Sequence, residues 1–97
     1  MPTYIVMFKW TSQGLKDIKQ SPSRLDAGRK AFEQTGLKMR EFFMVMGQYD
    51  CVAIAEAPDD ATLAKSILAT TSQGSITTET YRAFTEAEFR EIVAGLP

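Results

Sequence analysis

The chain has 97 residues, of which 44% are hydrophobic and 24% are charged, and its formal net charge is −1. This length is typical of a single domain, residues 1–97, and the hydrophobic fraction is enough for a core. No block of like charge is present, which argues against nucleic acid or an anionic membrane as a partner. No apolar run approaches about 18 residues and no signal-peptide pattern opens the chain, so we expect a soluble cytoplasmic protein.

Two residue types limit the chemistry that the chain can perform. Histidine is absent, and Cys51 is the only cysteine. The sequence therefore offers no credible zinc, iron or haem site, and it has no glycine loop that would hold phosphate. Cys51 lies in an apolar run without a disulfide partner, so we interpret it as a small buried hydrophobic residue in a reducing compartment. We expect neither a metal nor a cofactor.

The first half of the chain predicts a strand, a helix and a second strand. Residues 4–10 are dense in β-branched and aromatic side chains, which is typical of a strand. Ser21 and Pro22 indicate a helix start with serine as the cap, and apolar spacings of three and four extend this helix over 21–35. A second strand is predicted at 37–46, while the stretch between the first strand and the helix stays ambiguous.

The second half predicts a strand, a helix, a strand and a final helix. The strand at 51–57 is followed by a helix that carries carboxylates in its first turn and ends at Gly74. Residues 75–84 contain three threonines and alternate loosely, which predicts the last strand. Thr85 and Glu88 have the spacing of a capping box, which predicts the start of a C-terminal helix.

The tetrad Gly47-Gln48-Tyr49-Asp50 separates two apolar runs and predicts the tip of a β-hairpin. The order strand, helix, hairpin, helix, strand is that of an α+β, ferredoxin-like βαββαβ domain, here with an added C-terminal helix. Right-handed crossovers then predict an antiparallel four-stranded sheet with strand order 4132. Both long helices should cover the same face of this sheet.

The other face of the sheet is expected to be apolar as well. Along the first strand, the side that contains Tyr4 and the side that contains Ile5 are both apolar. A chain this short can cover such a face only with another copy of itself, so we predict a homodimer whose sheets pack face to face, with Phe8 and Phe42 at the interface. The alternative is a monomer with a partly exposed apolar sheet.

Several motifs resemble those of the GYD-domain family. They are Gly47, Tyr49 and Asp50 in the hairpin, Trp10-Thr11-x-x-Gly14, Ser21-Pro22, Ala57-Pro58-Asp59-Asp60, and Thr78-Glu79-Thr80 with Arg82-Ala83-Phe84-Thr85. The family signature is present here as Gly-x-Tyr-Asp, with Gln48 inserted. This resemblance covers nearly the whole chain and implies a dimeric α/β-barrel of ferredoxin-like protomers. It implies no substrate and no catalytic residue, but it favours the hairpin tetrad as the place to look for a site.

The predicted topology gathers a candidate site at one end of the sheet. The end of the first strand, the hairpin tip and the start of the last strand meet there, which places Trp10 near Tyr49 and Asp50 and beside the helix that begins at Ser21. Aromatic rings, a carboxylate and a helix N-terminus together predict a binding site for a small, partly apolar ligand at the mouth of the barrel. The residues that we expect to bind the ligand are Trp10, Gly47, Gln48 and Arg82.

Two functions remain open, and we prefer the first, in which the chain binds a small molecule without transforming it. In the second, it is a cofactor-independent enzyme, isomerase-like or monooxygenase-like, that acts on an aromatic or enolisable compound with Asp50 as the proton shuttle and Tyr49 as its catalytic partner. A purely structural interpretation stands beside both. Gly47 would then be a turn glycine with positive φ, and Asp50 would accept hydrogen bonds from backbone amides. Trp10 and Tyr49 would be core aromatics.

Overall fold

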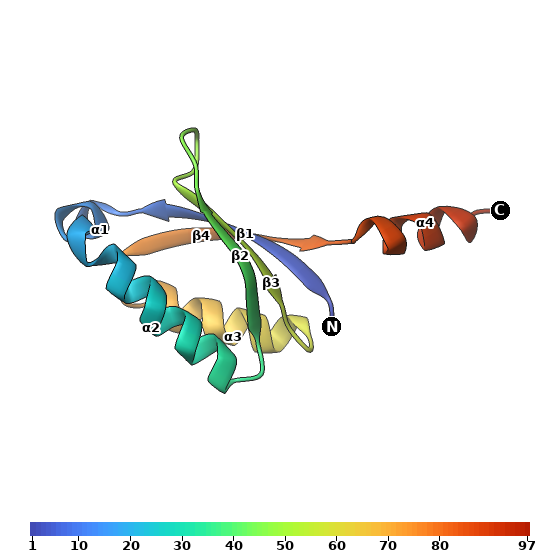
Figure 1. Cartoon of the computed structure of the whole chain (residues 1–97), viewed down its shortest axis with the longest axis horizontal. Helices are drawn as coiled ribbons and strands as arrows, with labels where there is room; N and C mark the ends of the chain where they lie inside the picture. Colours follow the sequence, from blue (N-terminus) through green and yellow to red (C-terminus); the bar gives the residue numbers. More distant parts are fainter.

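The computed structural model describes residues 1–97 as one antiparallel sheet with helices on one of its faces (Figure 1). The strands are β1 (Thr3–Trp10), β2 (Lys38–Met44), β3 (Cys51–Glu56) and β4 (Ile76–Ala83). The helices are α1 (Ser12–Lys16), the 3-10 helix η1 (Ile18–Gln20), α2 (Ser21–Gln34), α3 (Asp60–Thr71) and α4 (Glu86–Ala94). The sheet order β2-β3-β1-β4, with every neighbour antiparallel, confirms the predicted α+β fold and its 4132 order.

The stretch that the sequence left ambiguous, between β1 and α2, forms α1 and η1. The Thr11 side chain caps α1 by accepting a hydrogen bond from the Gly14 amide at 3.1 Å. At the start of α2 the expectation that Ser21 serves as the cap is wrong. The preceding residues already form a 3-10 turn, so Ser21 lies inside the helix and Gln20 takes the cap position without a side-chain bond. Pro22 stands in the first turn, where a missing amide hydrogen costs nothing.

The capping box predicted for α4 is formed, and α3 also begins with a capping side chain, which the sequence predicted only as a carboxylate of the first turn. The Asp59 carboxylate accepts a hydrogen bond from the Thr62 amide at 2.8 Å. Thr85 and Glu88 form a complete capping box, in which each side chain accepts a hydrogen bond from the other residue's amide, at 3.2 and 2.9 Å. Because these bonds are made within one helical turn, local sequence alone sets where both helices begin.

The core lies between the sheet and the helices α2 and α3. Alternate residues of β1 and β3 point into it, because successive side chains of a strand face opposite sides of the sheet. Its buried residues are Tyr4, Phe32, Leu37, Ala55, Ala57 and Leu63, with Met39 and Ile67 packed against them. Cys51 is 4% exposed on the same side, and burial raises the pKa of its thiol, which confirms its interpretation as a buried hydrophobic residue.

The opposite face of the sheet carries the other alternating set of side chains. In β1 these are Ile5 and Met7, which lie beside Ile54 and Val52 of β3. Phe43 of β2 lies beside Val52 on the same face, and its side chain is 51% exposed. We call the five residues Ile5, Met7, Phe43, Val52 and Ile54 the open face.

The expectation that Phe8 and Phe42 lie on this second face is wrong. Their rings contact each other with centroids 6.2 Å apart on the helix side of the sheet. The alternation of β1 places Phe8 on the same side as the buried residues Tyr4 and Val6, and the register pairs it with buried Cys51. The sheet surface that is available to a second copy is therefore the open face, which does not include Phe8 or Phe42.

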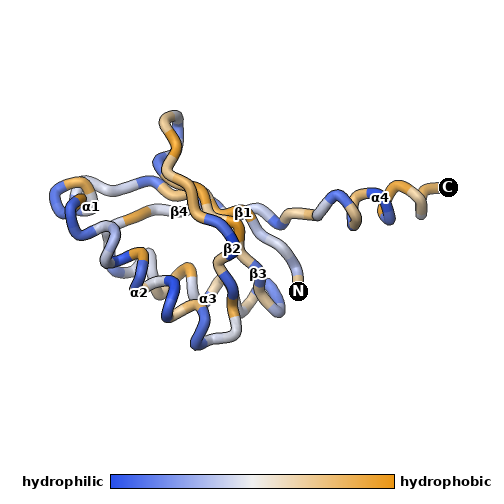
Figure 2. The backbone as a smooth tube through the Cα atoms, viewed as in Figure 1, coloured by the Kyte–Doolittle hydropathy of each residue, from blue (hydrophilic) through white to orange (hydrophobic).

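The helix α4 has the apolar stripe that its sequence predicts, but the stripe is not buried. Figure 1 shows α4 projecting from the end of β4, away from the sheet and the other helices, and it has no buried residue. Figure 2 shows apolar residues alternating with polar ones along it. The exposed fractions are 59% for Phe89, 49% for Ile92 and 47% for Val93, and 66% for Leu96, which follows the C-cap residue Gly95.

Two glycines predict opposite effects of the same substitution. A Cβ at Gly14 would lie 2.1 Å from the carbonyl oxygen of Ser75, whereas a Cβ at Gly28 in α2 would meet nothing within 4 Å. We expect Gly14→Ala to lower the free energy of unfolding by about 1–3 kcal/mol. Gly28→Ala should raise it by up to about 1 kcal/mol, because alanine restricts the unfolded chain and favours the helix. Urea denaturation measures both, and equal stabilities would contradict the close approach at Gly14.

Candidate functional site

Asp50 attaches the hairpin to β1 through its amide and its carboxylate, while its carbonyl forms a hydrogen bond within the hairpin. The amide donates to the carbonyl of Phe8 at 2.9 Å, and the carbonyl accepts from the amide of Val45 at 2.8 Å. The carboxylate oxygen Oδ2 accepts a hydrogen bond from the Trp10 amide at 3.0 Å. Trp10 and Asp50 thus lie together at the end of the sheet, where the topology predicted them, and Asp50 has the partner that the structural interpretation gave it.

Tyr49 reaches across the sheet to β4. Its hydroxyl donates to the Glu79 carboxylate, and the hydroxyl of Tyr81 donates to the same carboxylate. These hydrogen bonds lower the pKa of Glu79, because both stabilise its charged form. The same bonds raise the pKa of Tyr49 and of Tyr81, so an ionised carboxylate holds two neutral phenols at neutral pH. We call these three residues the tyrosine–glutamate cluster.

The cluster belongs to the open side of the sheet. The register places Glu79 beside Met7 and Tyr81 beside Ile5, both of which are residues of the open face. Tyr81 is 46% exposed. The two consecutive residues Tyr49 and Asp50 therefore form hydrogen bonds with different strands. Asp50 bonds the end of β1, and Tyr49 bonds the edge strand β4.

A groove of about 350 Å³ opens at the end of the sheet where Trp10 and Asp50 meet. We call it the hairpin-end groove. Its walls are apolar side chains from β1, β2, β3 and the start of α2, namely Trp10, Pro22, Leu25, Phe42, Met44 and Cys51. Its volume falls within the range of small-molecule sites, roughly 300–1,000 Å³. Ser21, at the first turn of α2, adds a hydroxyl to the lining.

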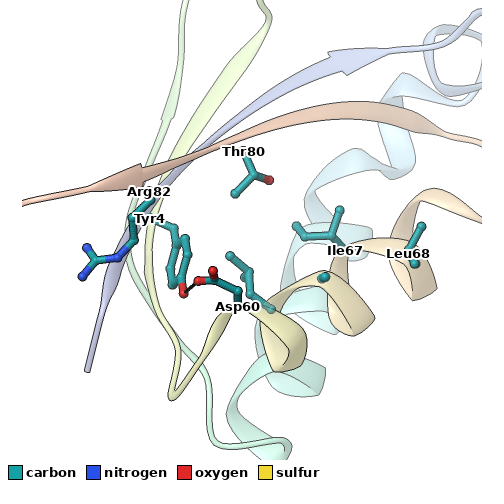
Figure 3. A pocket seen from close by; sticks show the side chains of 8 residues that line it. Tyr4, Asp60, Ile67, Leu68, Thr80 and Arg82 are labelled. Atoms are coloured by element: carbon teal, nitrogen blue, oxygen red, sulfur yellow. Dashed lines mark hydrogen bonds between the residues drawn. The ribbon is translucent and has the colours of Figure 1, made fainter.

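A second groove, of about 450 Å³, lies between α3 and β4 and is drawn in Figure 3. We call it the α3–β4 groove. Its apolar side is formed by Leu63, Ala64, Ile67 and Leu68 of α3, and its polar side by Tyr4, Asp60, Thr80 and Arg82. The hydroxyl of Tyr4 donates to the Asp60 carboxylate, as the dashed line in Figure 3 marks, and this bond raises the pKa of Tyr4.

Arg82 lies in this second groove and not at the hairpin end. It is paired with Tyr4, near the start of β1, whereas Trp10 at the other end of β1 is paired with Ile76. Its guanidinium carbon stands 5.8 Å from the ring centroid of Tyr4 and 4.5 Å from that of Phe84. The expectation that Arg82 joins Trp10 in one site is wrong, because their pairing positions lie toward opposite ends of the extended strand β1.

Gly47 and Gln48 are exposed at the hairpin tip and do not line the hairpin-end groove. The glycines with positive φ are Gly36 and Gly74, so the expectation of a positive φ at Gly47 is wrong. The loop between β2 and β3 is long enough to reverse the chain without a left-handed residue. A Cβ at Gly47 would meet nothing within 4 Å, so the structure places no steric demand for glycine there.

The sequence reading missed some residues that shape these sites. Leu25, Phe42 and Met44 line the hairpin-end groove, whereas the sequence predicts a helix position for Leu25, a strand position for Met44 and a dimer interface for Phe42. Glu79 and Tyr81 were not paired with Tyr49. Their spacing of two in a strand does put Glu79 and Tyr81 on one face, and that was the available signal.

The structure has neither a cluster of metal ligands nor a membrane-spanning helix. No three side chains of His, Cys, Asp or Glu come close enough together to hold a metal ion. None of the helices has the length and the apolar character needed to span a bilayer.

The fold and the hairpin define a ferredoxin-like α+β domain that carries a Gly-x-Tyr-Asp motif. The sequence model described as GYD domain matches residues 4–93, so the chain belongs to the GYD domain family. A relative from Thermus thermophilus, named "Glutamine synthetase and cystathionine beta-lyase binding protein", is 34% identical over 89 residues, which are 91% of this chain and 94% of the relative. The crystal structure of TTHA0845, also from Thermus thermophilus, shares the fold, with a TM-score of 0.57 and 24% identity over 88% of this chain and 95% of that one.

The tyrosine–glutamate cluster predicts that stability depends on pH in the acid range. Folding lowers the pKa of Glu79 below its usual value of 4.5, so its contribution is complete above pH 4.5 and is lost as the pH falls through the lower folded value. We expect the urea midpoint of the wild type to fall more steeply below pH 4.5 than that of Glu79→Gln. Glu33→Gln, which removes an exposed carboxylate of α2 outside the cluster, is the control. Equal acid slopes for the wild type and Glu79→Gln would contradict the cluster.

Proposed function

We propose that the chain is a homodimeric protein that binds a larger enzyme and does not itself catalyse a reaction. The observation that carries this proposal is the relative from Thermus thermophilus, whose name describes it as binding glutamine synthetase and cystathionine beta-lyase. The alignment takes in almost the whole of both chains. Any surface with which the relative binds its partners therefore has a counterpart in this chain, and glutamine synthetase is the first partner to test.

The hydrogen bonds of the two residues expected to be catalytic support binding over catalysis. A proton shuttle needs an acceptor that faces the substrate. One carboxylate oxygen of Asp50 accepts from the Trp10 amide, and the hydroxyl of Tyr49 donates to Glu79. Both groups thus hold the hairpin against neighbouring strands. The hypothesis of a cofactor-independent enzyme with Asp50 as its proton shuttle is the weaker one for this reason.

The open face supports the homodimer. A sheet that has helices on one side only and apolar side chains on the other leaves those side chains in water. A second copy related by a two-fold axis covers both open faces at once, because the same patch then meets itself. The tyrosine–glutamate cluster lies along one border of this patch, where a polar rim of an interface is expected.

An aspartate in the centre of the open face tests the dimer. Ile54→Asp would bury an unpaired charge between the two sheets, so we expect it to convert the dimer into a monomer. Analytical ultracentrifugation measures the mass, and Ala27→Asp on the exposed side of α2 is the control that should stay dimeric. A monomeric wild type would overturn the interface.

The partner is tested with purified glutamine synthetase and cystathionine beta-lyase from the same organism. On size-exclusion chromatography we expect the wild type and Ala27→Asp to co-elute with glutamine synthetase. If the wild type binds neither enzyme, the proposed function is wrong even where the dimer is correct.

A second candidate function is the binding of a small, partly apolar ligand, and the hairpin-end groove favours it. The groove combines the single tryptophan of the chain with an aliphatic wall and the first turn of α2. Such a site would bind a flat or branched apolar group between Trp10 and Leu25. A ligand there could accompany the binding of an enzyme, since the open face lies on the other side of the sheet.

Native mass spectrometry of gently purified protein tests the ligand. We expect one reproducible extra mass per protomer in the wild type. Leu25→Arg, which places a long charged side chain in the groove, should remove that mass, and the surface variant Ala27→Asp should keep it. An empty wild type would count against a tightly held ligand, and an extra mass that survives in Leu25→Arg would place the ligand elsewhere.

A further inference from the structure

The lining of the hairpin-end groove contains no charged side chain. It comes from η1, from the start of α2 and from the strands β1, β2 and β3, and its polar groups are the Ser21 hydroxyl, the Trp10 indole N–H and the Cys51 thiol. Burial raises the pKa of this thiol, so it is neutral at neutral pH. An ionised group of a ligand would leave water here without meeting an opposite charge in the lining, which is strongly unfavourable.

The start of α2 does not present the row of free amides with which other helix ends bind anions. The amide of Gln20 donates to the carbonyl of Asp17 at 2.9 Å, and the amide of Ser21 donates to the carbonyl of Ile18. Pro22, in the first turn, has no amide hydrogen. The 3-10 turn η1 and the proline thus remove the first donors that would hold a carboxylate or a phosphate.

The charged residues that adjoin the lining in the chain do not supply a partner for an ionised ligand. Lys9 and Glu41 precede lining residues of β1 and β2, so the alternation of the strands turns them to the other face of the sheet. One nitrogen of Arg24 donates to a backbone carbonyl of the preceding turn at 3.2 Å. The carboxylate of Asp50 accepts from a backbone amide of β1 at 3.0 Å, and its charge adds to the effect of burial on the pKa of Cys51.

We infer that the hairpin-end groove binds an uncharged molecule with an apolar body and a single hydrogen-bonding end, such as an amide or an alcohol. This inference rests on the second candidate function and adds the chemical class of the ligand to it. The apolar body lies between Trp10 and Leu25, and the polar end meets the Ser21 hydroxyl, which can both donate and accept. The volume of about 350 Å³ lies near the lower end of the range of small-molecule sites, which suits a compact ligand.

The fluorescence of Trp10 reports occupancy of the groove, because Trp10 is the only tryptophan of the chain and belongs to the lining. The probes are a neutral amide, an anion and a cation of similar shape, namely cyclohexanecarboxamide, cyclohexanecarboxylate and cyclohexylmethylamine. Each is titrated against wild-type protein freed of retained ligand. We expect the amide to bind with a dissociation constant at least about 10-fold lower than those of the two charged probes.

Two variants and one control locate the amide in the groove. Leu25→Arg places a charged side chain in the groove and should abolish the response, whereas the surface variant Ala27→Asp should keep it. Ser21→Ala should raise the dissociation constant of the amide about 5-fold through the loss of one hydrogen bond. Because the Ser21 side chain does not cap α2, this change leaves the helix intact. Equal binding by Ser21→Ala would overturn the role given to its hydroxyl.

The outcomes separate this inference from the proposed function. If the carboxylate or the amine binds as tightly as the amide, or if the extra mass in native mass spectrometry belongs to a charged compound, the groove is a ligand site but the inferred class is wrong. If no probe changes the fluorescence, the inference is wrong. Loss of co-elution with glutamine synthetase in Leu25→Arg would then show that the enzyme occupies the groove, and the proposed enzyme binding would stand.

Discussion

The hydrogen bonds of Asp50 are the constraint on which the arrangement of the sheet depends. A two-stranded ribbon is marginally stable by itself, and the β2–β3 hairpin extends beyond the rest of the sheet. The Asp50 amide and carboxylate bond Phe8 and Trp10 just before Cys51, the first paired residue of β3, so the hairpin is held by β1 up to its loop. The same bonds fix Trp10, which is why an apolar groove exists at this end of the molecule.

The Gly-x-Tyr-Asp motif serves both faces of the sheet. Asp50 positions the aromatic wall of the hairpin-end groove on the helix side, while Tyr49 bonds Glu79 beside the open face. Neighbouring residues of an extended chain point in opposite directions, so a Tyr-Asp pair is suited to bracing two surfaces at once. This accounts for the pair without any catalytic role.

The small size of the buried core explains why uncovered apolar surfaces matter here. Ten of the 97 residues are buried, and the open face and α4 leave further large apolar side chains in water. Small domains bury a small share of their surface, and association stabilises a fold that is marginal alone. A second copy packed on the open face would cover one of these two exposed sets. A protein with such surfaces is better suited to binding other chains than to enclosing a substrate.

The amino-acid sequence by itself determined the elements, their order and the strand order of the sheet, because these follow from local periodicity, from caps such as Asp59 and the Thr85–Glu88 box, and from the handedness of crossovers. It also placed Trp10 beside Asp50. Only the tertiary structure decided which face Phe8 occupies, that Arg82 lies far from Trp10, and that Tyr49 shares Glu79 with Tyr81. These facts depend on the register between strands and on the direction of each side chain, which join residues tens of positions apart and leave no local pattern.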